Sequence, residues 1–173
     1  MSARALRFVG ADDDRWKPAP ADQPVRPADH LLLSWSQWLE LREQWPQHLA
    51  AGVVFPNDGD LAQLLPDLQR LTLIALPFPK WTDGRAYSLA RTLRVRHRYA
   101  GELRAIGDVI PDMAAQLQRT GFDSVVLRAG ESVEVAARML NFFGEFYQGD
   151  VQERRLRFAR GAAAGAEGPR VRQ

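Results

Sequence analysis

The 173-residue sequence contains no cysteine, only two lysines and only three histidines. Without cysteine the chain has no disulfide bond, no thiolate nucleophile and no sulfur ligand for zinc or an iron–sulfur cluster. No two of the histidines, His30, His48 and His97, are three or four residues apart, so no helical pair of them can hold a metal ion. The sequence therefore predicts no metal site and leaves any other cofactor undetermined.

Long apolar runs are also missing, because no stretch approaches the roughly 20 apolar residues that cross a bilayer. The N-terminal sequence MSARALRFVGADDDRW has a short apolar part and then turns acidic, unlike a signal peptide. Hydrophobic residues make up 46% of the chain and charged residues 25%, which is typical of a globular protein. We therefore expect the protein to be cytoplasmic and to have no membrane partner.

The positive charge of the chain is concentrated at its C-terminal end. Residues 151–173 contain six arginines and two glutamates, a net charge of +4, whereas the whole chain has +2 and residues 1–150 therefore −2. The globular part is thus not basic, as a protein that binds the nucleic-acid backbone would be. Nucleic acid is therefore not the expected partner, and binding of nucleic acid through the basic tail is a third alternative.

The sequence divides into three parts. Residues 1–30 form an irregular N-terminal arm, because residues 10–30 hold four prolines, five aspartates and few large apolar residues, although LRFV before them suits a short edge strand. Residues 31–160 alternate strand-like and helix-like patterns and are expected to form a single α/β domain. Residues 161–173, GAAAGAEGPRVRQ, have the composition of a disordered tail.

Strand and helix patterns alternate four times within this domain. Apolar or alternating runs predict strands at 52–55, 71–78, 102–107 and 122–127, and helical patterns occur at 34–45, 58–68, 85–97, 108–121 and 131–147. Ser34 or Ser36, and Asp58 or Asp60, are placed to cap the first two helices, and Gly121 to end the fourth. Four short βα units predict a mainly parallel sheet with helices packed on it, either a small doubly wound sheet or half of a (β/α) barrel.

Ligands of parallel α/β proteins bind outside the carboxyl ends of the strands. The loops at those ends are FPNDGD, PFPKWTDGR, AIGD and LRAGE, and each contains a glycine and a carboxylate. A functional site is therefore expected at this edge of the sheet.

The DGR turn, Asp83 to Arg85, is the first candidate within this edge. Arg85 falls in the first turn of a helix, where a cation opposes the helix dipole and needs an anionic partner. Gly84 relaxes the backbone there, and Thr82 or Asp83 is placed to cap the helix. One interpretation is a salt bridge to Asp83, Asp108 or Glu102. The other is an oxyanion site made by Arg85, the free helix N–H groups and Ser88.

The rest of this helix follows a simple helical wheel. One face carries Ala86, Leu89, Ala90, Leu93 and His97 and is expected to pack on the sheet. Three arginines on the opposite face, Arg91, Arg94 and Arg98, are expected to be solvated.

The second candidate is the segment ELRAIGDVIPD, residues 102–112. Gly107 allows close backbone approach at a strand end, and Asp108 is placed to cap the next helix or, with Asp112, to face the same rim. Glu102 and Arg104 share one sheet face, so they must be satisfied internally, and they are candidates to reach Asp112 or Arg85. Two carboxylates beside an arginine suit acid–base chemistry or a structural ion-pair network.

Phe78 and Trp81, with Pro77 and Pro79, form a stiff aromatic loop at the same edge. Such a loop is suited to lining a pocket, to docking a partner or to covering the end of the sheet.

The blocks DGRAYSLARTLR and GELRAIGDV resemble a bacterial family catalogued as Domain of Unknown Function 934, and the resemblance covers roughly residues 50–150. It implies a role in sulfite reduction, since members are described as oxidoreductases of that process. The chain departs from the family at Thr120, where cysteine is usual, and at Met113, where glutamine is usual, so neither position is a candidate for chemistry.

The residues give no support to a literal oxidoreductase. No GxGxxG follows a strand, and a chain without cysteine cannot hold the cluster of sulfite reductase through thiolates. The first hypothesis is therefore an accessory protein of assimilatory sulfite reduction that acts with sulfite reductase. The alternative is a small enzyme that binds an anionic metabolite at the strand ends through Arg85, Asp108 and Asp112.

Overall fold

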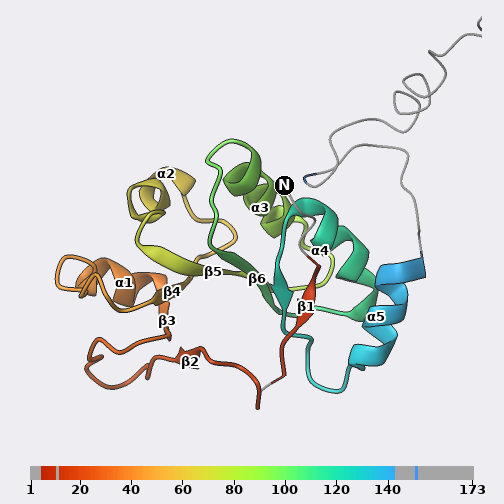
Figure 1. Ribbon diagram of the computed structural model, residues 1–173, viewed down its shortest axis with the longest axis horizontal. Helices are drawn as coiled ribbons and strands as arrows, with labels where there is room; N and C mark the ends of the chain where they lie inside the picture. The colour runs from red at the N-terminus through yellow and green to blue at the C-terminus, as the bar shows by residue number, and fades with distance from the viewer. Residues whose placement is uncertain (1–4, 11, 143–150, 152–173) are drawn as a thin grey trace, which may run out of the picture.

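The computed structural model describes residues 5–10, 12–142 and 151 of the chain (Figure 1). Its centre is a sheet of seven strands, each parallel to its neighbours, in the order β1-β7-β6-β5-β4-β3-β2. The chain is therefore an α/β protein with a parallel sheet, as the sequence predicts. The predicted C-terminal tail and the end of the last predicted helix lie outside the described residues.

The longest strands lie in the middle of the sheet. The strands are β1 (Arg7–Phe8), β2 (Lys17–Pro18), β3 (Leu31–Ser34), β4 (Ala51–Val54), β5 (Leu71–Phe78), β6 (Glu102–Gly107) and β7 (Ser124–Val125). The helices are α1 (Trp35–Leu41), α2 (Leu61–Leu64), α3 (Arg85–Val95), α4 (Ala114–Thr120) and α5 (Val133–Phe142), with 3₁₀ turns η1 (Leu65–Asp67) and η2 (Pro111–Met113). Within residues 31–160 the sequence predicted β4, β5, β6 and β7, and LRFV suggested the edge strand β1; it missed β2, which is two residues long, and β3, which runs directly into α1.

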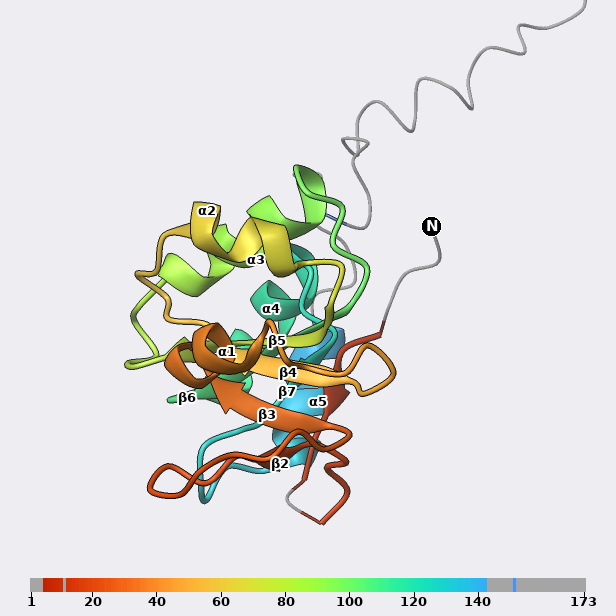
Figure 2. The ribbon, with the colours of Figure 1, turned by 90° about the vertical axis from the view of Figure 1, so that its left-hand side faces the viewer.

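The strand order decides between the two architectures that the sequence left open. From β2 to β7 each strand lies beside the next strand in the chain, with no point at which the order reverses. A doubly wound sheet requires such a reversal. The sheet curls instead into a half-barrel, and its crossovers place α2, α3 and α4 on the same face (Figure 2). Helix α5 packs on α4 and η2 at one end of this layer.

The main core fills the space between this helical layer and the sheet. Leu103 and Ala105 of β6 face the helices, as do Ile74, Leu76 and Phe78 of the neighbouring β5, and all five are fully buried. A continuous apolar strand such as β5 is expected in the middle of a parallel sheet, where both faces are covered.

The opposite, concave face is crossed by the N-terminal segment. Strand β1 pairs with β7 at one edge of the sheet and β2 pairs with β3 at the other, so the connecting residues pass across the open face (Figure 1). We call residues 12–16 of this connection the strap. Trp16 is 2% exposed, and its ring lies so close to Gly52 that a Cβ there would come within 2.8 Å of it. The predicted arm is thus irregular for most of its length but supplies two edge strands and a buried tryptophan.

The predicted helix ends agree with the structure where a cap residue marks them. Ser34 accepts a hydrogen bond from the Gln37 N–H and forms a capping box with it, and Asp60 accepts one from the Ala62 N–H. Gly121 ends α4 in the left-handed conformation, with φ of 101°.

Candidate functional site

The DGR turn lies at the carboxyl end of β5 and leads into α3. Nε of Arg85 lies 3.0 Å from Oδ1 of Asp83 and its Nη2 lies 2.7 Å from Oδ2, a bidentate ion pair. Nη1 lies 3.8 Å from the Asp58 carboxylate. The structure therefore contains the Asp83 salt bridge that was one of the two interpretations of this turn. It leaves the Arg85 side chain about half exposed, at 54%.

Asp83 organises this turn through several hydrogen bonds. Its carboxylate accepts from the backbone N–H of Arg85 and, at 3.0 Å, from the side-chain amide of Asn57. Hydrogen bonds from the Arg85 side chain and backbone, and then from Asn57, hold the pKa of Asp83 well below its usual range. Gly84 occupies the N-cap position of α3. Because glycine has no side chain, no side-chain hydrogen bond caps the helix from this position. Ser88 is exposed one turn further on.

Asp108 forms a second cluster beside the first, at the carboxyl end of β6. Its carboxylate accepts a hydrogen bond from the backbone N–H of Trp81 at 2.9 Å and another from Arg128 at 2.9 Å, and Arg128 also pairs with Glu131. The Arg128 side chain and the Trp81 N–H lower the pKa of Asp108. Asp108 therefore fastens neighbouring loops together, and the prediction that it caps the following helix is wrong.

Gly107 has the close-approach role that the sequence predicted. Its φ is 94°, and a Cβ at this position would lie 2.6 Å from the carbonyl oxygen of Phe78. The next residue, Asp108, donates its N–H to the same carbonyl at 2.8 Å. The ends of β5 and β6 are thus drawn together beneath the Trp81 loop.

Asp112 does not join these clusters. It lies in η2 with its side chain exposed, and among the described residues it forms no ion pair. The predicted pair of carboxylates at Asp108 and Asp112 is therefore not assembled around Arg85.

Glu102 and Arg104 lie on the concave face instead of the strand-end rim. Arg104 is 1% exposed and donates to Glu102 at 2.9 Å, to Ser124 at 3.1 Å and to Asp14 of the strap at 2.6 Å. Arg7 also pairs with Glu102. The predicted internal satisfaction of this pair is confirmed, but its suggested partners, Asp112 and Arg85, are wrong, because the pair points away from the loops that carry them.

Burial alone would raise the pKa of Glu102. The hydrogen bonds from Ser124 and Arg104 and the charges of Arg104 and Arg7 outweigh that effect, so its pKa lies below the ordinary value of 4.5. Glu102 therefore remains ionised inside the network near neutral pH.

The structure also corrects the prediction, made from the helical wheel of α3, that Arg94 is solvated. Its side chain is only 9% exposed, and it pairs with Asp123 and donates to the carbonyl oxygens of Gly121 and Gly101, both at 2.8 Å. The wheel placed Arg94 in solvent because it considers one helix alone, whereas α4 and the start of β6 cover this side. His97, predicted to be buried, is exposed.

Trp81 is the most exposed large apolar side chain among the described residues, at 54%. It projects from a loop whose backbone is fixed by Asp108. The Asp83–Arg85 pair follows Trp81 in the same loop, and Arg128 donates to the same Asp108 carboxylate. The sequence did not single out Arg128 or Asn57 as a candidate site residue. Both lie in loops that it predicted at the carboxyl ends of the strands.

The geometry defines a half-barrel α/β protein with an exposed tryptophan on a braced strand-end loop. Residues 52–158 match the model of the family described as "Bacterial protein of unknown function (DUF934)", and the chain belongs to this family. No curated protein matches the chain. In the described part of the chain, no helix combines the length and apolar character needed to cross a membrane.

Proposed function

We propose that the chain is a cytoplasmic accessory protein of assimilatory sulfite reduction that binds sulfite reductase through the surface around Trp81. The pathway comes from the sequence resemblance to the family, and the binding surface comes from the geometry. The observation that carries the proposal is a large aromatic side chain that is exposed on a rigid loop.

An exposed tryptophan on a fixed loop is suited to protein binding. Tryptophan is enriched among the residues that dominate interface energies, and a preorganised loop loses little conformational entropy when it binds. The Trp81 backbone is held by Asp108, which accepts a hydrogen bond from Arg128, and Arg128 is itself paired with Glu131. The loop is therefore ordered before any partner arrives.

The charged groups at this edge are also suited to the rim of an interface. Arg85 is paired with Asp83, and Arg128 with Asp108 and Glu131, so each cation is already compensated. Such pairs can contribute to specificity and orientation while the aromatic side chain supplies most of the affinity.

Co-purification tests this proposal directly. Tagged full-length protein should retain sulfite reductase from an extract of the parent bacterium, and Trp81→Ala should lose it. Leu39→Ala removes a different exposed apolar side chain, on α1, and should retain the reductase. Equal retention by Trp81→Ala and the parent protein would contradict the proposed surface.

Growth on defined sulfur sources tests the pathway. A deletion strain should grow poorly on sulfate or sulfite and normally on sulfide or cysteine. Normal growth on every source in a strain without a second copy of the gene would contradict the sulfur assignment.

The alternative, a small enzyme that binds an anionic metabolite, is supported by the exposed half of Arg85 at the first turn of α3. Its guanidinium is already engaged by Asp83, which favours the accessory role. Complementation of the deletion strain separates the two functions. Arg85→Ala should complement and Trp81→Ala should fail if the accessory role holds, and the reverse result would favour the enzyme.

A further inference from the structure

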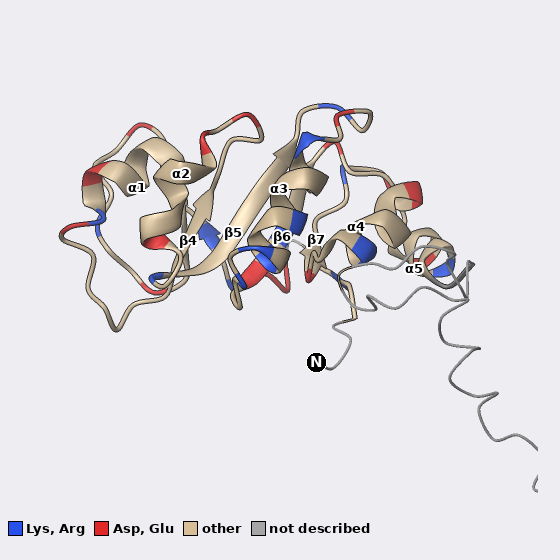
Figure 3. Cartoon of the chain, turned by 90° about the horizontal axis from the view of Figure 1, so that it is seen from above, with Lys and Arg blue, Asp and Glu red and all other residues tan. Residues whose placement is uncertain are grey.

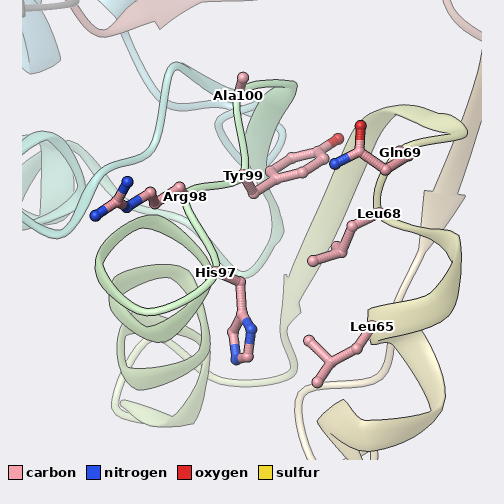
Figure 4. Close-up of a pocket in the computed structure, with 7 residues that line it drawn as sticks. All are labelled: Leu65, Leu68, Gln69, His97, Arg98, Tyr99 and Ala100. Atoms are coloured by element: carbon pink, nitrogen blue, oxygen red, sulfur yellow. The ribbon is translucent and has the colours of Figure 1, made fainter.

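A cavity of about 290 Å³ lies at the amino ends of β5 and β6, the opposite edge of the sheet from Trp81 (Figure 4). Leu65, Leu68 and Gln69 line it from the crossover before β5, and residues 97–100 line it from the turn that links α3 to β6. This volume lies close to the lower end of the range for small-molecule sites. The cavity thus belongs to neither of the strand-end clusters.

Tyr99 forms a fixed wall of this cavity. It is 6% exposed, and its hydroxyl donates to the carbonyl oxygen of Leu71 at 2.9 Å. The guanidinium carbon of Arg94 lies 5.6 Å from the centre of its ring. The Tyr99 N–H donates to the Leu93 carbonyl at 3.0 Å, so both the ring and the backbone are held.

Arg98 turns the chain between His97 and Tyr99 in a conformation that non-glycine residues rarely adopt. Its φ is 52°, which costs an arginine about 1 kcal/mol or more. Figure 4 shows the consequence: His97 projects into the space between α3 and η1, opposite Leu65, and Tyr99 points towards Gln69. The strained turn therefore presents an imidazole and an aromatic ring to the same space.

The lining combines an apolar part with hydrogen-bonding groups. Leu65, Leu68 and the Tyr99 ring supply the apolar part, and the His97 imidazole and the Gln69 amide supply polar groups. Within the described residues, neither His97 nor Gln69 has a side-chain hydrogen bond. None of the described residues that line the cavity carries a carboxylate.

The charge around the cavity is positive. Arg70 follows Gln69 in the chain, and Arg96 and Arg98 flank His97; within residues 5–10 and 12–142, none of the three pairs with a carboxylate. Arg70 donates to the carbonyl oxygen of Arg42, and Figure 4 shows the Arg98 guanidinium directed away from the cavity, so these arginines act on the cavity through their electrostatic field and not by direct contact. Arginine and lysine positions gather on and beside α3 in Figure 3. The nearby carboxylates, Asp67 and Asp123, are engaged with Arg42 and Arg94. Uncompensated cations around a concave surface attract anions.

We propose that this cavity binds a small organic anion with an apolar body, such as an aromatic carboxylate. The apolar body packs between Leu65, Leu68 and the Tyr99 ring. The carboxylate accepts hydrogen bonds from His97 and Gln69 and is favoured by the positive potential of the nearby arginines.

Titration of the full-length protein with 2-naphthoate, followed by two-dimensional NMR, tests this assignment. Saturable shifts should occur at residues 65–69 and 97–100, and the uncharged 2-naphthamide should bind at least about tenfold more weakly. His97→Ala and Gln69→Ala should each weaken 2-naphthoate binding by about three- to tenfold. Both side chains are exposed, so both variants should keep the parent fold, and Arg91→Gln serves as the matched control.

Three results would overturn the proposal. The absence of saturable shifts at the cavity would show that no organic anion binds there. Equal binding of the two probes would show that the charge of the ligand plays no part. Undiminished binding in folded His97→Ala and Gln69→Ala variants would place the ligand elsewhere.

Discussion

The carboxylate of Asp14 lies 2.6 Å from Nη1 of Arg104, although 90 residues separate them in the sequence. Arg104 is 1% exposed, and its other partners, Glu102 and Ser124, belong to the sheet itself. The strap contributes Asp14 to this network, and Nη2 of its Arg15 lies 3.9 Å from the Glu102 carboxylate. The pair therefore links the segment that crosses the concave face to the middle of the sheet.

Removal of Asp14 should destabilise the protein. Asp14→Ala leaves part of the buried Arg104 charge uncompensated and should lower the free energy of unfolding by about 1–3 kcal/mol. Urea denaturation measures this change. Asp13→Ala removes the neighbouring exposed carboxylate and should change the stability by less than about 0.5 kcal/mol. Equal effects of the two substitutions would show that the strap does not depend on the Arg104 contact.

Arg94 should be essential for stability although it lies on a helix rich in exposed arginines. Arg94→Ala removes the partner of Asp123 and the donor to Gly121 and Gly101, and should cost about 3–5 kcal/mol. Arg91→Ala, on the exposed side of α3, should cost less than about 0.5 kcal/mol. Urea denaturation of both variants checks the difference, and a small effect at Arg94 would contradict the network described for it.

Arg98 should be replaceable by glycine with a gain in stability. Relief of the left-handed strain at φ of 52° exceeds the added flexibility of the unfolded chain, so Arg98→Gly should raise the free energy of unfolding by about 0.5–1 kcal/mol. Arg96→Gly provides the control because Arg96 has a helical φ of −87°, and it should lose about 0.5–1 kcal/mol. Thermal unfolding measures both changes, and destabilisation by Arg98→Gly would show that its side chain matters more than its backbone.

Protonation of Glu102 should make the protein less stable in acid. Its folded pKa lies below the ordinary 4.5, so its contribution is complete above that value and is lost as the pH falls through the folded pKa. Glu102→Gln removes this titration, and its stability should therefore vary less than that of the parent between pH 4.5 and lower values. Urea unfolding at several acidic pH values tests this expectation. Parallel curves for the two proteins would contradict it.

The sequence predicted the elements whose signal is local. Strands β5 and β6 have the predicted bounds because apolar continuity or alternation marks them, and Asp60 and Gly121 cap helices because their side chain or backbone suits the position. The two-residue strand β2 carries no such signal. It exists only because β3 offers an unpaired edge beside the incoming chain.

The sequence predicted the contacts of the candidate site that join residues close in the chain. It missed the contacts that join distant segments. The Asp83–Arg85 pair spans two residues, and it was one of three ion pairs predicted because a cation in the first turn of a helix needs an anionic partner. Arg94 depends on Gly121 and Asp123, and Arg104 depends on Asp14, and each of these partners comes from another part of the chain. A helical wheel or strand alternation assigns a residue to a face but does not say what covers that face.

The pairing of β1 with β7 has a consequence for assembly during synthesis. Arg7 and Phe8 are paired with Ser124 and Val125, so β1 has no neighbouring strand until residues 124–125 have left the ribosome. Strands β3 to β6 follow one another in both sequence and space and can pair as they emerge. The strap can take its position across the concave face only after β1 has paired with β7 and β2 has paired with β3. The strap is therefore made before the sheet that it crosses but reaches its native position after it, and until then the concave face of the half-barrel stays open to other molecules in the cell.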